Sequence, residues 1–215
     1  MAQWFERPEL SEVAPGAFHL PGALSPERQI ALAAGCQSLI DGPVPAYVPI
    51  VRGGGRMHVR MLCLGRHWNG RSYRYEPVRS DHDDLPAPGL PPDFAALARE
   101  LAARVGMTIE PDVCILNLYD ADGRMGLHQD RDESPASIAA GIPVVSISLG
   151  DTARFLLGGV RRREPVVPLL LRSGDGFVFG REARLRYHGV SRIQPGTTPP
   201  WLSLSGRLNL TFRQY

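Results

Sequence analysis

The residues of this chain that are best suited to redox chemistry are His128 and Asp130, followed much later by His188. Two imidazoles and one carboxylate form the ligand set that holds non-haem Fe(II) on one face and leaves the other positions open. Arg207 and Arg213 follow the last of these ligands. A guanidinium pairs with a carboxylate in a fixed plane, so these arginines could hold a dicarboxylic co-substrate against the metal. The pattern predicts an oxygen-activating enzyme.

The elements that must position these groups are strands. Side chains of a strand alternate between its faces, so His128 and Asp130 would share a face and Gln129 would point elsewhere. The closing segment 207–213 (RLNLTFR) would have one polar and one apolar face. Its polar face would carry Arg207, Asn209, Thr211 and Arg213, and its apolar face Leu208, Leu210 and Phe212.

The segment 113–119 (VCILNLY) shows the same alternation. Val113, Ile115, Asn117 and Tyr119 would lie on one face, with Cys114, Leu116 and Leu118 on the other. Asn117 and Tyr119 could therefore supply an amide and a phenol to the pocket that the arginines line.

Each signal has an ordinary structural explanation when it stands alone. Isolated His-x-Asp pairs occur often by chance, and a single histidine such as His188 is more often a hydrogen-bonded side chain than a ligand. Arg207 or Arg213 alone would more often be a solvated charge on an edge strand. Their occurrence in this order, with matching parity in predicted strands, favours the metal site.

Taken together, five segments resemble the AlkB family, and its bacterial members in particular. These are Asn117–Tyr119, Leu127–Glu133, Val144–Gly150, Tyr187–Gly189 and Arg207–Arg213. AlkB proteins are Fe(II)- and 2-oxoglutarate-dependent dioxygenases that repair alkylated nucleic acid. The resemblance extends from about Gly53 to the C-terminus. It implies a double-stranded β-helix in which 2-oxoglutarate and O₂ are converted to succinate and CO₂ while an N-methyl group is lost as formaldehyde.

The resemblance also implies a role for each residue of the site. Fe(II) would be held by His128, Asp130 and His188, with no further catalytic residue. The 2-oxoglutarate pocket would comprise Asn117, Leu118, Tyr119, Arg207, Asn209 and Arg213. In this assignment Arg213 faces the C1 carboxylate, while Arg207 and Tyr119 hold the C5 carboxylate.

Substrate contacts follow from the same resemblance. They would be Trp68, Tyr73, Arg74, Tyr75, Asp132 and Arg162, with Arg124 and Arg131 as basic DNA contacts. Trp68 would stack a flipped base against His128, and the Asp132 carboxylate would favour a cationic base. The structural alternatives are a core aromatic for Trp68 and surface ion pairs for Asp132 and Arg162.

Two departures from the family pattern concern the substrate mouth. The segment Ser134–Gly141 is a few residues longer than in the bacterial relatives, and Gly55 and Arg56 replace a tyrosine–threonine pair. Both leave the iron site intact and put lesion and strand preference in question.

The composition excludes some chemistry and localises charge. All 24 basic residues are arginines; Schiff-base chemistry and a P-loop phosphate site, which need a lysine, are therefore excluded. Seven arginines and a single acid lie between Arg52 and Arg79, interleaved with aromatic rings. Such a stretch can bind phosphates and stack bases, or it can be a solvated arginine-rich hairpin.

Three cysteines at unrelated spacings predict a reducing, cytoplasmic setting. No stretch approaches the apolar length of a membrane span. A monomer is expected, because no heptad pattern is present.

The predicted architecture is mainly β with flanking helices, a cupin-like jelly roll in a single domain (1–215). Helices are predicted for 26–40, capped by Ser25, and for 92–105, ended by Gly106. Residues 1–110 would hold these helices and a nucleotide-recognition lid; short strands would make residues 111–215 the catalytic jelly roll.

Three functions remain open at this point. The first is oxidative demethylation of N-alkylated bases, of the 1-methyladenine and 3-methylcytosine type, in single- or double-stranded DNA, with RNA as a second substrate class. The second is a 2-oxoglutarate dioxygenase that hydroxylates a small molecule or a protein side chain. The third is a non-catalytic binding jelly roll, which would have no need for the complete iron and co-substrate set.

Overall fold

Two antiparallel sheets face each other and form a jelly roll, and the computed structural model describes residues 10–215 of the chain. The larger sheet has the order β1–β2–β11–β8–β13–β6–β3 and the smaller one β10–β9–β12–β7. The larger sheet contains β1 (Ser11–Ala14), β2 (Ala17–Leu20), β3 (Arg60–Leu64), β6 (Val113–Tyr119), β8 (Val144–Gly150), β11 (Gly176–Phe179) and β13 (Arg207–Arg213). The smaller contains β7 (Met125–His128), β9 (Thr152–Leu157), β10 (Val167–Leu171) and β12 (His188–Gln194). The predicted jelly roll is confirmed.

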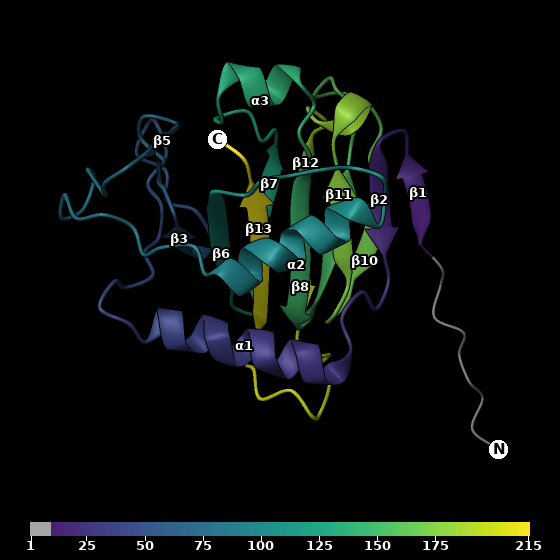
Figure 1. The fold of residues 1–215 in the computed structure, drawn as a ribbon, viewed down its shortest axis with the longest axis horizontal. Helices are drawn as coiled ribbons and strands as arrows, with labels where there is room; N and C mark the ends of the chain where they lie inside the picture. The colour runs from purple at the N-terminus through teal and green to yellow at the C-terminus, as the bar shows by residue number, and fades with distance from the viewer. Residues whose placement is uncertain (1–9) are drawn as a thin grey trace.

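Two helices cover the outer face of the larger sheet (Figure 1). Helix α1 (Pro26–Ile40) begins at Ser25, whose side chain accepts a hydrogen bond from the Arg28 amide as predicted. Helix α2 (Pro92–Ala103) ends two residues before the predicted Val105, because the chain has already turned towards Gly106, which has a φ of 68°. Within residues 10–215, no helix has both the length and the apolarity needed to cross a membrane.

The alternation of β6 and β13 divides the apolar core into two layers. One layer lies between the helices and the larger sheet and includes Leu116 and Phe212. The other lies between the two sheets and includes Ile115, Phe155 and Phe177. Because successive side chains of β6 enter different layers, its predicted parity is confirmed.

The predicted division near residue 110 is too simple. Strands β1 and β2 extend the larger sheet at one end through β11, and β3 pairs with β6 at the other. Residues before 111 therefore contribute strands to the jelly roll as well as helices and a lid. These strands are short, and β2 and β3 join the sheet through partners far along the chain, so no local pattern indicated their place.

Two further elements surround the open end of the jelly roll. The arginine-rich segment 52–79 carries a hairpin of β4 (His67–Asn69) and β5 (Arg74–Glu76), in which Trp68 lies opposite Tyr75. The segment after Glu133 forms a short helix, α3 (Pro135–Ala139), capped by Ser134. Figure 1 shows α3 at the end of the sheets where β7 stops.

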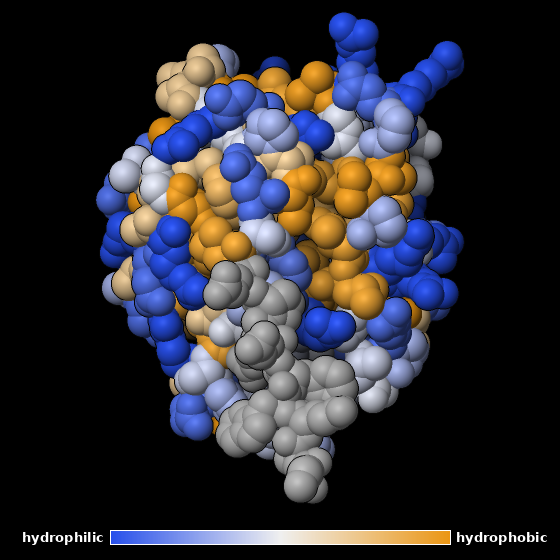
Figure 2. All heavy atoms as spheres, turned by 90° about the vertical axis from the view of Figure 1, so that its right-hand side faces the viewer, coloured by the Kyte–Doolittle hydropathy of each residue, from blue (hydrophilic) through white to orange (hydrophobic). Residues whose placement is uncertain are grey.

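Apolar side chains gather on the flank formed by the edge strands β1 and β10 (Figure 2). Val167 and Leu170 of β10 are 49% and 40% exposed. Pro168 lies between them and cannot donate to a ladder, which limits pairing of this edge with another chain.

Candidate metal and co-substrate site

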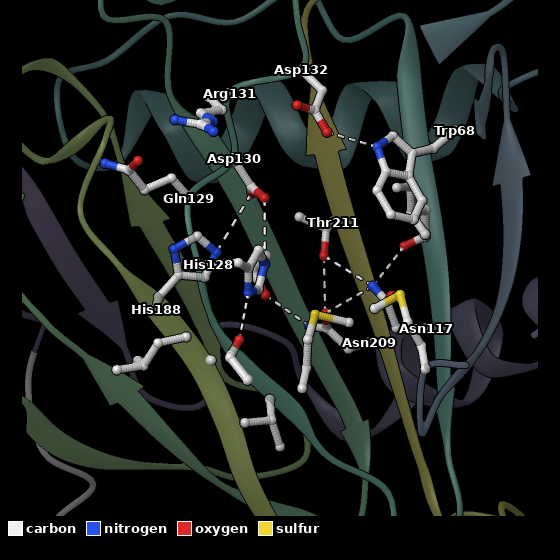
Figure 3. A pocket seen from close by; sticks show the side chains of 18 of the residues that line it. Trp68, Asn117, His128, Gln129, Asp130, Arg131, Asp132, His188, Asn209 and Thr211 are labelled. Atoms are coloured by element: carbon white, nitrogen blue, oxygen red, sulfur yellow. Dashed lines mark hydrogen bonds and ion pairs between the residues drawn. The ribbon is translucent and has the colours of Figure 1, made fainter. Parts of the chain in front are cut away.

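The three predicted metal ligands meet where β7 and β12 pair. His128 ends β7, His188 begins β12, and these two residues are direct partners in the ladder. Asp130 lies in the loop just after β7 and is buried. Its Oδ1 is 3.6 Å from His128 Nε2 and its Oδ2 is 3.7 Å from His188 Nε2. The three side chains turn towards one another in Figure 3, at separations too long for hydrogen bonds but suited to ligands of one ion.

The charge states of Asp130 and His188 suit a divalent metal. Burial raises the pKa of the Asp130 carboxyl, but Arg213 and the two imidazoles outweigh it and hold that pKa well below its usual range. Burial, aided by the nearby His128, lowers the pKa of His188 to about 4. An ionised carboxylate and a neutral imidazole are the forms that bind metal.

Gln129 has a different task from its neighbours, as the strand parity predicts. Its amide nitrogen donates to the main-chain oxygens of Leu185 at 2.6 Å and Val160 at 3.4 Å. It therefore ties the ligand loop to the segments on either side of it.

A second group of metal-type side chains, next to the β4–β5 hairpin, is already paired within itself. His67 Nε2 lies 2.6 Å from Asp81 Oδ1, and His82 Nδ1 lies 3.2 Å from the same oxygen. The ring of Tyr47 packs against both imidazoles, and its hydroxyl donates to the Trp68 main-chain oxygen at 2.7 Å. This cluster braces the strand that carries Trp68.

The metal ligands line a pocket of about 920 Å³ between the sheets, which Arg207 enters from β13. Arg207 is 3% exposed and has no carboxylate partner among the described residues. Its Nη2 donates to Ser148 Oγ at 2.9 Å and its Nη1 to the Leu171 main-chain oxygen at 3.2 Å. Burial lowers its pKa to about 10, so it stays charged at neutral pH. A buried cation without a counterion is a binding group for an anion.

Polar groups of β6 and β13 form the wall beside Arg207. Asn117 and Asn209 lie opposite each other in the ladder, and Thr211 Oγ1 donates to Asn209 Oδ1 at 2.9 Å. Asn117 Nδ2 lies 3.3 Å from Thr211 Oγ1 (Figure 3). Burial raises the pKa of Tyr119 to about 12, so its hydroxyl remains a hydrogen-bond donor.

Arg213 has partners of its own within the protein. Its Nη2 donates to Asp130 Oδ2 at 2.7 Å, and its Nε lies 3.0 Å from Glu133 Oε1. Of its terminal nitrogens, only Nη1 is buried without a partner. The predicted contact with the C1 carboxylate therefore has one free donor.

Buried polar atoms without partners test whether the pocket fits 2-oxoglutarate. Arg213 Nη1, Arg207 Nε and Asn117 Oδ1 make no hydrogen bond with any residue of the described range 10–215. Such groups are costly unless a ligand or water satisfies them. Two of them are guanidinium donors, placed to receive an anion between the sheets, so the residues present fit a dicarboxylate next to a His–Asp–His metal site.

Leu118 lies on the other face of β6. Its side chain packs in the layer between the helices and the larger sheet, away from the cavity that Asn117 and Tyr119 line. Strand alternation directs this side chain away from the cavity, so its place among the 2-oxoglutarate residues stays a prediction.

The predicted substrate side of the pocket contains Trp68, Tyr73 and Asp132. Trp68 Nε1 donates to Asp132 Oδ2 at 2.8 Å, and the Tyr73 ring lies edge-on to Trp68 with 5.9 Å between centroids. Tyr73 has a φ of 55°, a strained conformation for a tyrosine. Tyr75 lines the same pocket and is only 6% exposed. Its ring would therefore contact a bound base rather than the sugar-phosphate backbone of the nucleic acid.

The predicted arginine contacts differ in position. Arg162 lines the pocket with its guanidinium 5.7 Å from the Tyr187 ring, and Arg131 also lines it. Arg74 is exposed and does not line the pocket, and Arg124 lies beside His58, its Nη2 2.9 Å from His58 Nε2. Arg74 and Arg124 can therefore contact only nucleic acid that extends beyond the pocket.

Several residues of the site were not predicted from the sequence. Ser146 accepts a hydrogen bond from Asn209, and Ser148 accepts one from Arg207. The two serines are two residues apart in β8, so strand alternation alone could have placed both on the pocket face. Glu133 and Arg184 form a buried ion pair, at 2.8 Å, beside Asp130. Charged side chains are expected at the surface, so only the structure reveals this pair.

The jelly roll, the His–Asp–His triad and the unpaired arginine define a non-haem iron oxygenase that uses a 2-oxo acid. Comparison with known proteins agrees. The model of the 2OG-Fe(II) oxygenase superfamily matches residues 16–213. The chain is 38% identical to the alpha-ketoglutarate-dependent dioxygenase AlkB of Salmonella typhimurium, covering 97% of this chain and 94% of that protein. It therefore belongs to the AlkB family of that superfamily, whose members use Fe(II), 2-oxoglutarate and O₂.

Other relatives carry more specific names. The Arabidopsis thaliana DNA N(6)-methyladenine demethylase ALKBH1D is 38% identical over 94% of this chain, which spans half the length of that protein. The solved structure of OsALKBH1 superposes with a TM-score of 0.90 at 37% identity, covering 96% of this chain and all of that one. The carbocyclase SnoK from nogalamycin biosynthesis, at 13% identity and a TM-score of 0.59, shares the fold alone.

Proposed function

We propose that this protein oxidatively demethylates N-alkylated bases in DNA. The observation that carries the proposal is that Trp68 and Asp132, joined at 2.8 Å, line the same pocket as the metal triad and the unpaired Arg207. Bound Fe(II), with 2-oxoglutarate and O₂, supplies the oxidation of an N-methyl C–H bond, and the hydroxylated carbon then leaves as formaldehyde. The protein's own side chains bind and orient the two reactants.

The residues divide these tasks by position. Arg207 and Tyr119 hold the distal carboxylate of 2-oxoglutarate, and the free Nη1 of Arg213 meets its other end. Trp68 offers a ring on which a flipped base stacks, worth about 1–3 kcal/mol for each base. Arg52, whose guanidinium is 5.5 Å from the Tyr73 ring, and Arg162 both line the pocket, where they could contact phosphates.

Two lesion classes are candidates. The carboxylate of Asp132 in the pocket favours a base made cationic by alkylation, such as 1-methyladenine or 3-methylcytosine. The names of the plant relatives favour N6-methyladenine, a neutral base. We propose the cationic class as the principal substrate, with RNA carrying the same lesions as a further one.

The proposal is tested by succinate release with three matched oligonucleotides that carry 1-methyladenine, N6-methyladenine or unmodified adenine. We expect the first to stimulate turnover most. Stimulation by N6-methyladenine alone would reverse the order of the two classes. Equal succinate release with all three, without loss of a methyl group, would favour hydroxylation of a small molecule or a protein side chain.

A cytoplasmic location and a monomeric state remain proposals. The first is supported by Cys36, Cys63 and Cys114, which are buried free thiols as expected in a reducing compartment. Fractionation of cells and the molar mass in solution would test them.

A further inference from the structure

A buried carboxylate with no role in the site described above lies beside the metal ligands. The Glu133 side chain is 0% exposed and contacts two guanidiniums. Its Oε2 is 2.8 Å from Arg184 Nη2, and its Oε1 is 3.0 Å from Arg213 Nε. Neither contact has hydrogen-bond geometry, so the attraction is mainly electrostatic. A charge buried this completely is stable only when paired.

Both arginines that contact Glu133 also hold Asp130. Arg213 Nη2 donates to the Asp130 carboxylate at 2.7 Å, and Arg184 Nη1 donates to the Asp130 main-chain oxygen. Asp130 is thus held at its main chain and at its side chain, by two arginines that Glu133 bridges. All four side chains are buried.

The two carboxylate oxygens of Asp130 have different surroundings. Oδ2 accepts from Arg213, whereas Oδ1 makes no hydrogen bond and faces His128 Nε2 at 3.6 Å. A guanidinium free to do so pairs with both oxygens of a carboxylate. Both Nη2 and Nε of Arg213 donate to Oδ2, and Nε also lies 3.0 Å from Glu133 Oε1. The attraction of Glu133 for Nε would hold the guanidinium in this position, with Oδ1 left open.

The four groups also balance in charge. Asp130 and Glu133 contribute two negative charges, and Arg184 and Arg213 two positive ones. Loss of the Glu133 charge would leave a net positive charge within the buried cluster. That charge would oppose a divalent cation at the triad and would favour the dianionic 2-oxoglutarate.

We propose that Glu133 is a positioning residue for the metal site. By bridging Arg184 and Arg213 it keeps one oxygen of Asp130 available to the metal and balances the surrounding charge. The proposal rests on the assignment of His128, Asp130 and His188 as the metal ligands. Groups that orient metal ligands typically change affinity 10- to 100-fold when replaced.

The test compares Glu133→Gln with Glu110→Gln, a matched change at a side chain that is 76% exposed. Mn²⁺ serves as a redox-stable probe, and its binding is followed by electron paramagnetic resonance on protein whose fold is checked by circular dichroism. We expect Glu133→Gln to bind Mn²⁺ about 10- to 100-fold more weakly, while 2-oxoglutarate binds as well as or better than in wild type at saturating Mn²⁺. Glu110→Gln should match wild type in both.

Two further variants separate the possible failures. Glu133→Asp keeps the charge, and its Mn²⁺ affinity should stay close to wild type. Glu133→Gln with unchanged Mn²⁺ affinity, or Glu133→Asp as weak as Glu133→Gln, would overturn the proposal. Parallel loss of Mn²⁺ and 2-oxoglutarate binding with a lowered Tm would show a structural role only. If His188→Ala binds Mn²⁺ as wild type does, the metal assignment itself is wrong.

Discussion

Arg207 and Arg213 show how similar side chains on one face of a strand acquire different functions. Arg213 has carboxylate partners at 2.7 and 3.0 Å, whereas Arg207 is buried with hydroxyl and carbonyl partners only. The first arginine therefore orders the metal ligands and keeps one free donor, Nη1, for the co-substrate. The second has no carboxylate partner among residues 10–215 and is fully available to an external carboxylate. The sequence predicted both as co-substrate residues and could not separate them, because the partners come from distant segments.

Replacing Arg207 by methionine should separate stability from binding. The change removes a buried, unpaired charge, so the Tm of the ligand-free protein should stay the same or rise. The affinity for 2-oxoglutarate should fall by about 100-fold, because the charge-assisted hydrogen bonds from the guanidinium to the co-substrate are lost. Calorimetry gives both quantities, with Arg192→Met, at an exposed position of β12, as the control. A large drop in Tm together with unchanged affinity would contradict this assignment.

Replacing Asp132 by asparagine should change which base is preferred. Asparagine can still accept the hydrogen bond from Trp68 Nε1, so the ring should stay in place. Loss of the charge should lower kcat/KM for 1-methyladenine by about tenfold, with a smaller effect on neutral N6-methyladenine. If both substrates lose activity equally, the carboxylate does not select for charge.

At the scale of elements, the pairing of β7 with β12 brings two histidines into register. A bulge follows at Gly189, where a Cβ atom would lie 2.6 Å from the Met125 main-chain oxygen and 2.9 Å from that of Gly126. Only glycine allows the two strands to approach so closely next to His188.

Gly189→Ala should therefore displace β12 from β7 and move His188 away from its partners. We expect Mn²⁺ binding to weaken at least tenfold in protein that remains folded, measured by isothermal titration. Gly126→Ala, where an added Cβ has open space, is the control and should bind normally. Normal Mn²⁺ binding by Gly189→Ala would show that β7 and β12 can move apart without weakening the metal site.

The faces of β6 and β13 could be predicted, because a period of two fixes which side chains meet and both faces have distinct polarity. The lengths of α1 and of these strands followed from capping and turn residues. The places of β2 and β3 in the sheet and the Glu133–Arg184 pair could not be predicted, since each depends on contacts distant in sequence. Strand alternation predicts that the Leu118 side chain faces the helices, and the structure confirms this orientation.

At the scale of the whole molecule, the two layers have different roles. The layer between the helices and the larger sheet stabilises the fold, and the layer between the two sheets contains the site. The larger sheet is braced by α1 and α2 on one face and supplies the co-substrate wall on the other. The smaller sheet supplies two metal ligands and closes the pocket. Ligands bound between the sheets should therefore hold the two together.

Metal and 2-oxoglutarate should accordingly raise the stability of the folded protein. At 100 times the dissociation constant, a ligand that binds only the folded state adds about 2.7 kcal/mol. We expect a higher Tm with Mn²⁺ and 2-oxoglutarate together than with either alone, and reversal by a chelator. His188→Ala should show no metal-dependent rise. A rise in that variant equal to wild type would place the metal elsewhere.

We propose that the Fe(II) held by the His–Asp–His triad demethylates a base bound beside Trp68 and Asp132. The most direct measurement is the mass of an oligonucleotide with a single 1-methyladenine after anaerobic loading with Fe(II) and 2-oxoglutarate, followed by exposure to air. We expect loss of one methyl group with wild type and none with His128→Ala or Asp130→Ala. An unchanged mass with metal-loaded wild type, or equal loss with these variants, would contradict it.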